Sequence, residues 1–245
     1  MHGFNALNDD IIILQDRNIS FANPTTSEFS KNPSAFAQKC ISRMIGIKNK
    51  HKWGREHLVR EILEFRWHGR GGQGAWTASE LLARTALHEG KYIQSFPEFG
   101  PERMGAPVTA FTRVSTQPIR IHCAIYDPDV VVVLDPTLLK TVPVVAGINK
   151  EDDNIIINSK DPPAKVRQDL RVTKGRVWTV PATQIAIETL GLPITNTAML
   201  GTVARATGLV KMESLEKIVR ERFRADLGEK NMAVIKRAFE EATKE

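Results

Sequence analysis

Apolar and polar positions alternate in a regular way from residue 62 onward. Residues 62–67 alternate with the period of a strand. Residues 75–89 carry apolar side chains at helical spacing, and Gly90 follows where such a helix would end. A second strand is predicted over residues 91–96. This part of the chain therefore predicts a strand–helix–strand unit.

The alternation of strands and helices continues to the C-terminus. Residues 130–134 form an unbroken apolar run, which is typical of a central strand covered on both faces. A hairpin is predicted from residues 108–114 and 119–122. Further strands are predicted at residues 154–158 and 176–180, and helices at residues 164–170, 182–190, 197–207, 214–223 and 229–243. Residues 59–245 thus predict a single α/β domain, a three-layer α/β/α sandwich around a mixed, mainly parallel sheet.

Residues 1–58 depart from this pattern and predict an irregular N-terminal extension. They contain turn-forming stretches around Pro24 and Pro33. The net charge of +6 divides equally between the first 63 residues and the remaining 182, so the N-terminal part is more basic per residue. The extension is either a docking arm or a dispensable tail. Its charge suits nucleic acid, an anionic ligand or an ordinary solvated surface.

The composition change near residue 58 suggests a further hypothesis about this extension. Translation would start near Leu58 or Val59, and the upstream segment would be an artefact of the gene model. An intact mass near 27.4 kDa for the native protein would contradict this hypothesis.

The sequence favours a cytoplasmic protein. No basic and then apolar leader opens the chain, and no run of about eighteen apolar residues is present. Cys40 and Cys123 form neither a CxxC pair nor a disulfide framework. No membrane partner is expected.

A glycine-rich segment separates the first predicted strand from the first predicted helix. It consists of Gly69, Arg70, Gly71, Gly72, Gln73 and Gly74. A strand that ends in glycines and restarts as a helix presents free backbone N–H groups at the positive end of the helix dipole. This arrangement predicts a phosphate or carboxylate site. His68 and Arg70 flank it as further donors. The alternative is a tight turn that binds nothing.

The glycine-rich segment can be compared with two known kinds of nucleotide-binding loop, the nicotinamide dinucleotide loop and the P-loop. Gly69, Gly71 and Gly74 satisfy G-x-G-x-x-G. A nicotinamide site also needs an acidic residue at the tip of the second strand. The strand predicted at residues 91–96 has none, because Glu98 comes after Pro97. A P-loop is excluded because no Gly-Lys-Ser/Thr follows.

Two later segments carry further candidate residues. The loop around Glu102 and Arg103 is rich in proline and glycine, so it either holds charges for a ligand or partner or is an ordinary surface loop. Asn196 begins a predicted helix, as its N-cap or as a second anion contact, with Thr195 as the other candidate cap. Asp135 is predicted to cap a helix.

Several motifs are absent from the sequence. It contains no HExxH, GxSxG or CxxCxxC motif and no metal-ligand spacing of cysteine and histidine. We therefore predict no catalytic residue and no metal ligand in this chain. The aromatic platforms expected of a single-strand binder are also missing, so no nucleic-acid partner is predicted. A binding or assembly subunit fits the sequence better than an independent catalyst.

Three separated motifs resemble one protein family. They are His68 to Ala75 (HGRGGQGA), Phe99 to Pro107 (FGPERMGAP) and Asn196 to Gly201 (NTAMLG). In this order they resemble the gamma subunit of 2-oxoacid:ferredoxin oxidoreductases, above all the archaeal four-subunit pyruvate type. The resemblance runs from about Leu63 to the C-terminus. Met104 departs from it, because the family often has a second arginine there.

The resemblance implies a role inside an enzyme complex. Such a complex decarboxylates a 2-oxoacid on thiamine diphosphate, passes two electrons through [4Fe-4S] clusters to ferredoxin, and transfers the acyl group to coenzyme A. Alpha, beta and delta subunits would be the partners and would hold the thiamine and the clusters. The gamma subunit would serve the coenzyme A side and be inactive alone. The alternative is a stand-alone nicotinamide- or flavin-binding dehydrogenase domain.

Overall fold

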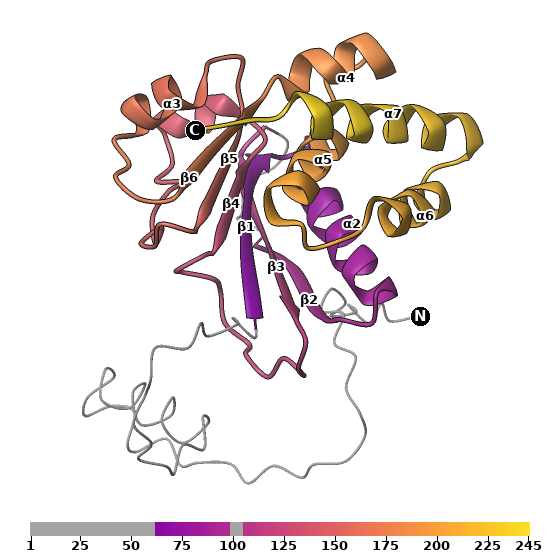
Figure 1. Cartoon of the computed structure of the whole chain (residues 1–245), viewed down its shortest axis with the longest axis horizontal. Helices are drawn as coiled ribbons and strands as arrows, with labels where there is room; N and C mark the ends of the chain where they lie inside the picture. Colours follow the sequence, from indigo (N-terminus) through magenta and orange to yellow (C-terminus); the bar gives the residue numbers. More distant parts are fainter. Residues whose placement is uncertain (1–61, 99–104) are drawn as a thin grey trace, which may run out of the picture. The chain divides into compact units, whose positions relative to one another are not determined.

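The computed structural model describes residues 62–98 and 105–245 (Figure 1). The predicted extension at residues 1–58, together with Glu102 and Arg103, lies outside the described residues. In the part that is described, no helix is long and apolar enough to cross a membrane.

The described residues form one seven-stranded sheet with the order β2-β3-β1-β4-β5-β6-β7. The strands are β1 (Ile62–Arg70), β2 (Tyr92–Glu98), β3 (Pro107–Ser115), β4 (Val130–Val133), β5 (Asn154–Asn158), β6 (Arg176–Val180) and β7 (Thr243–Lys244). Strands β1, β4, β5 and β6 are parallel neighbours, whereas β3 and β7 run in the opposite direction. The prediction of a mixed, mainly parallel sheet is confirmed.

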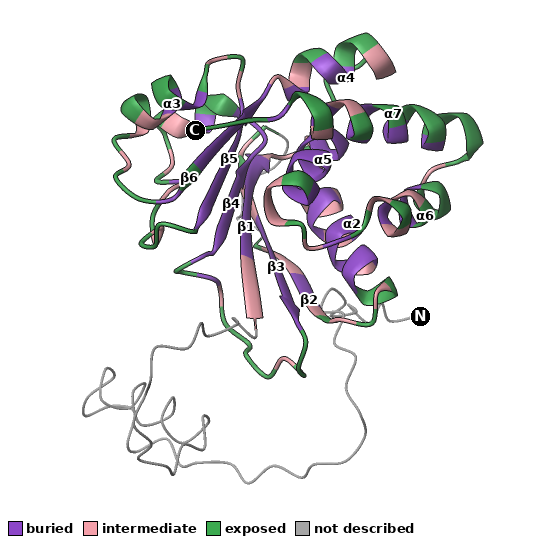
Figure 2. Cartoon of the chain, viewed as in Figure 1, coloured by how far each residue is buried: buried purple, intermediate pink, exposed green. Residues whose placement is uncertain are grey.

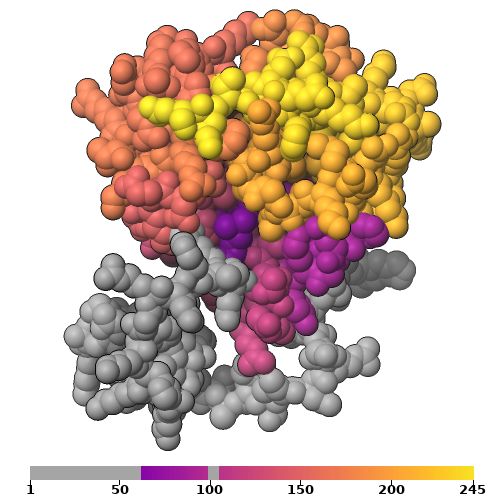
Figure 3. Space-filling model, in the orientation of Figure 1, coloured from indigo at the N-terminus to yellow at the C-terminus, as the bar shows by residue number. Residues whose placement is uncertain are grey.

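Helices cover both faces of this sheet unequally. The helices are α2 (Ala75–His88), α3 (Pro163–Leu170), α4 (Ala182–Leu190), α5 (Asn196–Thr207), α6 (Met212–Arg222) and α7 (Ala225–Glu241), with a 3₁₀ turn η1 (Pro136–Lys140). One face packs against α2, α4, α5, α6 and α7, and the other against η1 and α3 (Figure 1). In the space-filling view the orange and yellow C-terminal helices form one continuous surface (Figure 3).

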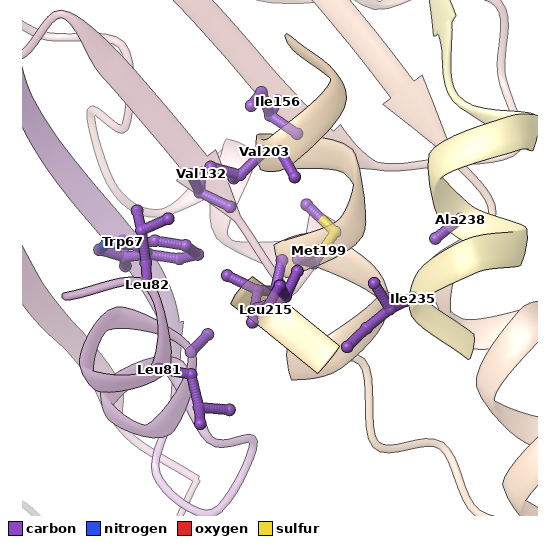
Figure 4. Packing of buried hydrophobic residues seen from close by; sticks show 14 of the residues in the cluster. Trp67, Leu81, Leu82, Val132, Ile156, Met199, Val203, Leu215, Ile235 and Ala238 are labelled. Atoms are coloured by element: carbon purple, nitrogen blue, oxygen red, sulfur yellow. The ribbon is translucent and has the colours of Figure 1, made fainter. Parts of the chain in front are cut away.

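Strand β4 is buried on both faces, which explains why its sequence is apolar without interruption. Val130 and Val132 belong to the larger core, under the helices, while Val131 and Val133 belong to the smaller core on the opposite face. Successive side chains of a strand point to opposite faces, so a strand buried on both sides needs apolar residues throughout. Figure 2 shows this strand buried, and Figure 4 shows Val132 among the residues of the larger core.

The predicted hairpin at residues 108–114 and 119–122 is wrong. Strand β3 is antiparallel to β1 on one side and to β2 on the other, so both of its edges are already paired. Residues 116–129 contain no strand. The second strand of the hairpin was predicted from an alternation over only four residues, 119–122. Such a short pattern does not show whether the neighbouring strand has an unpaired edge.

Strand β2 is longer than predicted. It runs through Pro97 to Glu98, with Pro97 opposite Ala110 of β3. Proline has no N–H to donate, and an edge strand tolerates it where that position faces away from the neighbour. An acidic residue, Glu98, therefore does stand at the tip of this strand, contrary to the sequence-based expectation.

Candidate functional site

The glycine-rich loop joins β1 to α2 by a sharp turn. Strand β1 ends at Arg70 and helix α2 begins at Ala75. Gly72 has φ of 93° and Gly74 has φ of 77°, both in the left-handed region. Side chains with a Cβ rarely adopt this conformation, which explains glycine at these two positions.

Among the described residues, no side chain caps the N-terminus of α2. Gly74 occupies the N-cap position and supplies no side-chain cap, and the first turn carries no acidic residue. The N–H groups at the start of an α-helix have no acceptor within that helix. They give this end a partial positive charge of about half an elementary charge. An anion placed here would be stabilised.

A hollow of about 310 Å³ opens beside this helix end. It is lined by Arg70, Gly71, Gly72, Gly74, Ala75, Trp76, Thr77, Pro97, Glu98, Val108, Thr109 and Ala110. Ligand pockets span roughly 300–1,000 Å³, so this hollow suits part of a large cofactor. Trp76 and Thr109 were not identified from the sequence, because they reach the loop only through the start of α2 and the pairing of β3 with β1.

Arg70 is held by acceptor groups of the protein. Its Nε lies 3.2 Å from Asp135 Oδ2, its Nη2 donates to Thr137 Oγ1 at 2.9 Å, and its Nη1 donates to the Gly105 carbonyl at 2.9 Å. The side chain keeps 30% of its exposure. The guanidinium therefore stabilises the conformation of the loop. Its N–H groups, which were expected to bind an anion, donate to acceptors of the protein.

Gln73 ties the loop to the end of β4. Its Nε2 donates to Asp135 Oδ2 at 2.7 Å, and its Oε1 accepts the Arg70 N–H at 2.8 Å. Asp135 also caps η1 by accepting the Thr137 N–H at 2.9 Å, which confirms the predicted cap. Burial alone would raise the pKa of Asp135. The hydrogen bonds from Thr137 and Gln73 and the charge of Arg70 outweigh burial and lower that pKa.

This junction lies where the connections after two neighbouring strands leave on opposite faces. The chain after β1 continues into α2 under the larger core, and the chain after β4 continues into η1 over the smaller core. In open α/β sheets, ligands bind at such a switch point beyond the carboxyl ends of the strands. The glycine loop therefore lies at such a switch point.

His68 does not join the site. It is 5% exposed, and its Nε2 accepts a hydrogen bond from Arg66 Nε at 3.1 Å. Burial, and then the charge of Arg66, lowers the pKa of His68 to about 3. A neutral, buried imidazole that does not line the hollow is no donor for an anion there, so this sequence-based expectation is wrong.

Asn196 meets the glycine loop in the folded chain. A Cβ on Gly74 would lie 2.5 Å from Asn196 Nδ2. Asn196 is the first residue of α5 and 6% exposed, while Thr195 holds the N-cap position without a side-chain hydrogen bond. Gly201 of the same motif has a packing role, because a Cβ there would lie 2.3 Å from the Ile235 carbonyl oxygen of α7.

The sheet does not build a standard dinucleotide site. In that fold the second strand lies beside the first and carries the ribose-binding acid. Here β3 lies antiparallel between β1 and β2. Glu98 at the tip of β2 is therefore two strands away from β1. The strand order, and not a missing acid, is what argues against nicotinamide.

No metal centre is found within the described ranges. There, no group of three or more His, Cys, Asp or Glu side chains is placed to hold an ion. Cys123 is exposed and forms no disulfide.

Comparison with known proteins places the described domain in one family. Residues 64–241 match the family described as pyruvate ferredoxin/flavodoxin oxidoreductase. A Pyrococcus abyssi protein named pyruvate/ketoisovalerate oxidoreductases common subunit gamma is 57% identical over 179 residues, which cover 73% of this chain and 96% of that protein. Pyruvate synthase subunit PorC of Methanothermobacter thermautotrophicus is 48% identical over 183 residues, covering 75% and 97%.

A solved structure supports the same assignment. The pyruvate oxidoreductase subunit PORC of Thermotoga maritima has 39% sequence identity and a TM-score of 0.68, and the match covers 76% of this chain and 99% of that one. These matches favour the subunit over the stand-alone dehydrogenase. The chain belongs to the pyruvate ferredoxin/flavodoxin oxidoreductase family, as a gamma subunit.

Proposed function

We propose that this gamma subunit serves the coenzyme A side of a complex that oxidises 2-oxoacids. The complex would convert a 2-oxoacid and coenzyme A to acyl-coenzyme A and carbon dioxide, and pass two electrons to ferredoxin. Relatives are named as subunits of pyruvate synthase and of pyruvate/ketoisovalerate oxidoreductases, which supports this reaction class.

One observation carries the coenzyme A assignment. The uncapped N-terminus of α2 borders a hollow whose wall is the glycine loop itself. Coenzyme A brings a diphosphate and a 3′-phosphate, and such groups are favoured by free N–H donors at a helix start. Gly69, Gly71, Gly72 and Gly74 would bring the backbone close to the ligand. Arg70 and Gln73 would hold the loop in shape through Asp135.

The remaining predicted contacts belong to this proposal. Asn196 would act from the start of α5, where it touches Gly74. Glu102 and Arg103 would act from the loop between β2 and β3, whose residues 99–104 lie outside the described part of the chain. Gly105 and Ala106, which follow these residues, are bonded to Gly71 and so lie beside the glycine loop.

The redox groups would lie on other subunits. An iron–sulfur cluster needs several cysteine thiolates, and the described residues contain Cys123 alone. Alpha, beta and delta subunits would hold the clusters and thiamine diphosphate, and ferredoxin would receive the electrons from the complex. We place the complex in the cytoplasm, without nucleic-acid or membrane partners. The isolated chain would show no turnover with pyruvate and an electron acceptor.

Gly72 offers a test of the coenzyme A assignment. A Cβ at this position meets no atom within 4 Å, and the φ of 93° imposes the same backbone strain on Asn and on Asp. Asn and Asp are similar in shape and tolerate the left-handed region better than most residues. In the assembled complex, Gly72→Asp should weaken coenzyme A binding at least tenfold more than Gly72→Asn, measured by calorimetry without 2-oxoacid. Equal affinities for the two variants would contradict the assignment.

The subunit assignment has its own test. Purification of the chain from its native cells should bring three partner subunits, including one with iron–sulfur clusters and one with thiamine diphosphate. Catalytic turnover of 2-oxoacid by the purified chain alone would contradict the proposal.

A further inference from the structure

Four polar side chains meet in the interior between helix α2 and the sheet. They are Trp67 of β1, Ser79 of α2, Ser95 of β2 and Thr112 of β3, and each is at most 3% exposed. Trp67 stands among the apolar residues of the larger core (Figure 4). One helix and the three strands of this half of the sheet thus contribute one polar side chain each.

The four side chains form one set of hydrogen bonds, which we call the α2–sheet network. Ser79 Oγ lies 2.8 Å from Ser95 Oγ and 2.9 Å from Thr112 Oγ1. Trp67 Nε1 donates to Thr112 Oγ1 at 3.1 Å, and Thr112 Oγ1 donates to the Ser79 carbonyl at 3.3 Å. Ser79 Oγ also lies 3.2 Å from the Phe111 carbonyl oxygen. Ser79 therefore ties α2 to β2 and β3 at once.

The α2–sheet network restricts how the helix can lie on the sheet. Burying polar groups is costly unless they are bonded, and a bonded network in the low-dielectric interior favours a single arrangement. Apolar contacts are non-directional, so they tolerate a small slide of α2 along the strands. Hydrogen bonds weaken steeply with poor geometry, so the bonds of Ser79 do not. The network therefore fixes the position of α2 relative to β2 and β3.

The α2–sheet network lies directly behind the walls of the hollow. Each of its three hydroxyl residues is two positions along the chain from a residue that lines the hollow. These pairs are Ser79 with Thr77, Ser95 with Pro97, and Thr112 with Ala110. One wall belongs to α2 and the other to β2 and β3. A shift of α2 on the sheet would change the spacing between these walls.

We propose that Ser79, Ser95 and Thr112 are positioning residues, which hold the start of α2 in place on β2 and β3 and so set the shape of the hollow. None of the three lines the hollow, so each acts through its neighbours in the walls. The network itself rests on the hydrogen bonds described above, whereas its effect on coenzyme A rests on the proposed function.

A matched pair of threonine variants tests this role in the assembled complex. Thr112 and Thr85 are both fully buried, but the Thr85 hydroxyl donates to the Leu81 carbonyl of its own helix, at 2.7 Å. Valine has the shape of threonine without the hydroxyl. Thr112→Val should raise the KM for coenzyme A about three- to tenfold and leave the KM for the 2-oxoacid within about twofold. Thr85→Val should change neither KM by more than about twofold.

Thr112→Ser is the conservative variant that separates position from stability. It keeps the hydroxyl and loses a buried methyl group, so it should lower the melting temperature and keep the natural KM for coenzyme A. A KM that rose in all three threonine variants together with the loss of melting temperature would show a purely structural role. That result would overturn the proposal.

Hydrogen exchange in the full chain gives a readout that does not involve coenzyme A. The Ala78 N–H donates to the Gly74 carbonyl at 3.0 Å and closes the first turn of α2. Its exchange should be at least about tenfold faster in Thr112→Val, and close to the natural rate in Thr112→Ser and Thr85→Val. An unchanged exchange rate in Thr112→Val would overturn the proposal.

The proposed function is tested separately by Gly72→Asp. If Thr112→Val left both KM values unchanged while Gly72→Asp weakened coenzyme A binding, the positioning role would be overturned and the proposed function would stand. If neither variant affected coenzyme A, both would fail. A raised KM for coenzyme A in Thr112→Val, with faster exchange at Ala78 and a natural KM in Thr112→Ser, is the result that supports the positioning role.

Discussion

The two ends of helix α2 use the same residue type for different purposes. Gly74 precedes the helix with φ of 77°, and Gly90 follows it with φ of 80°. A Cβ on Gly90 would meet nothing within 4 Å, whereas one on Gly74 would strike Asn196. At the C-terminal end, only the backbone conformation requires glycine. At the N-terminal end, the backbone conformation and the close approach of Asn196 from another helix both require it.

The charged groups at the two ends also differ. At the C-terminal end, Glu89 accepts from Lys91 Nζ at 2.8 Å and from the Lys211 N–H at 2.7 Å, which fastens α2 to the start of α6. At the N-terminal end, the helix donors face a hollow, and the loop side chains bond to one another around Asp135. One end is closed by the protein, and the other opens onto the hollow.

The largest expected effect is a difference in stability between alanine variants of the two glycines. Gly90→Ala should lower the free energy of unfolding by about 1 kcal/mol, the cost of a left-handed residue with a Cβ. Gly74→Ala adds the collision with Asn196 and should lower it by about 3 kcal/mol. Denaturant unfolding of the full chain measures both. Equal losses for the two variants would remove the distinction between the two ends.

The same two variants should also differ in their KM for coenzyme A. In the assembled complex, Gly74→Ala displaces Asn196 and should raise the KM for coenzyme A at least tenfold. Gly90→Ala should leave it unchanged. A comparable rise with Gly90→Ala would show that the effect comes from general destabilisation.

The second prediction concerns pH and the strand that leads into the N-terminal end. The pKa of His68 is about 3 in the folded chain, below its ordinary value of 6.5, so between these values the unfolded chain binds the extra proton. The stability linked to His68 is therefore fully present above pH 6.5 and is lost as the pH falls toward 3. Between pH 6.5 and 5 the loss should be about 2 kcal/mol.

His68→Gln tests this pH dependence, because it removes the titrating group and keeps a polar side chain. Urea unfolding of the full chain at a series of pH values should show a shallower slope between pH 5 and 6.5 for the variant than for the natural chain. Identical slopes would show that His68 titrates normally.

The third prediction compares an ion pair at each end. Arg70→Ala removes the bonds to Asp135, Thr137 and Gly105 that shape the glycine loop. In the complex it should raise the KM for coenzyme A about fivefold and the KM for the 2-oxoacid less. Lys91→Ala breaks the pair with Glu89 and should change neither. An equal rise in both KM values for Arg70→Ala would show that the loop has a structural role and no specific role in coenzyme A binding.

The smallest effect is expected from Glu89. Burial would raise its pKa, but the hydrogen bonds from Lys91, the Lys211 N–H and Ser214 lower it below its ordinary value. The stability linked to Glu89 is present above about pH 4.5 and is lost as the pH falls through the lowered pKa. Glu89→Gln should cost about 1 kcal/mol at pH 7 in thermal unfolding, and less at pH 3. A cost that does not depend on pH would contradict the ionic role.

Much of the fold could be predicted because it depends on neighbouring residues. The period of apolar positions located α2, and the bounds of β5, β6 and α4 agree with the prediction to the residue. The unbroken run at β4 indicated burial on both faces. The failures came from long-range pairing. The hairpin was wrong because β3 had no free edge, and Glu98 was placed outside β2 because proline there suits only an edge strand.

The sequence by itself determined the glycine loop, its position between strand and helix, and the family, because these are properties of consecutive residues and local motifs. Only the tertiary structure decided the partners of its side chains. Arg70 is bonded to Asp135, His68 is buried beside Arg66, and Asn196 lies on Gly74. These contacts join segments far apart in the chain, and they depend on strand order and helix packing, which no local pattern encodes.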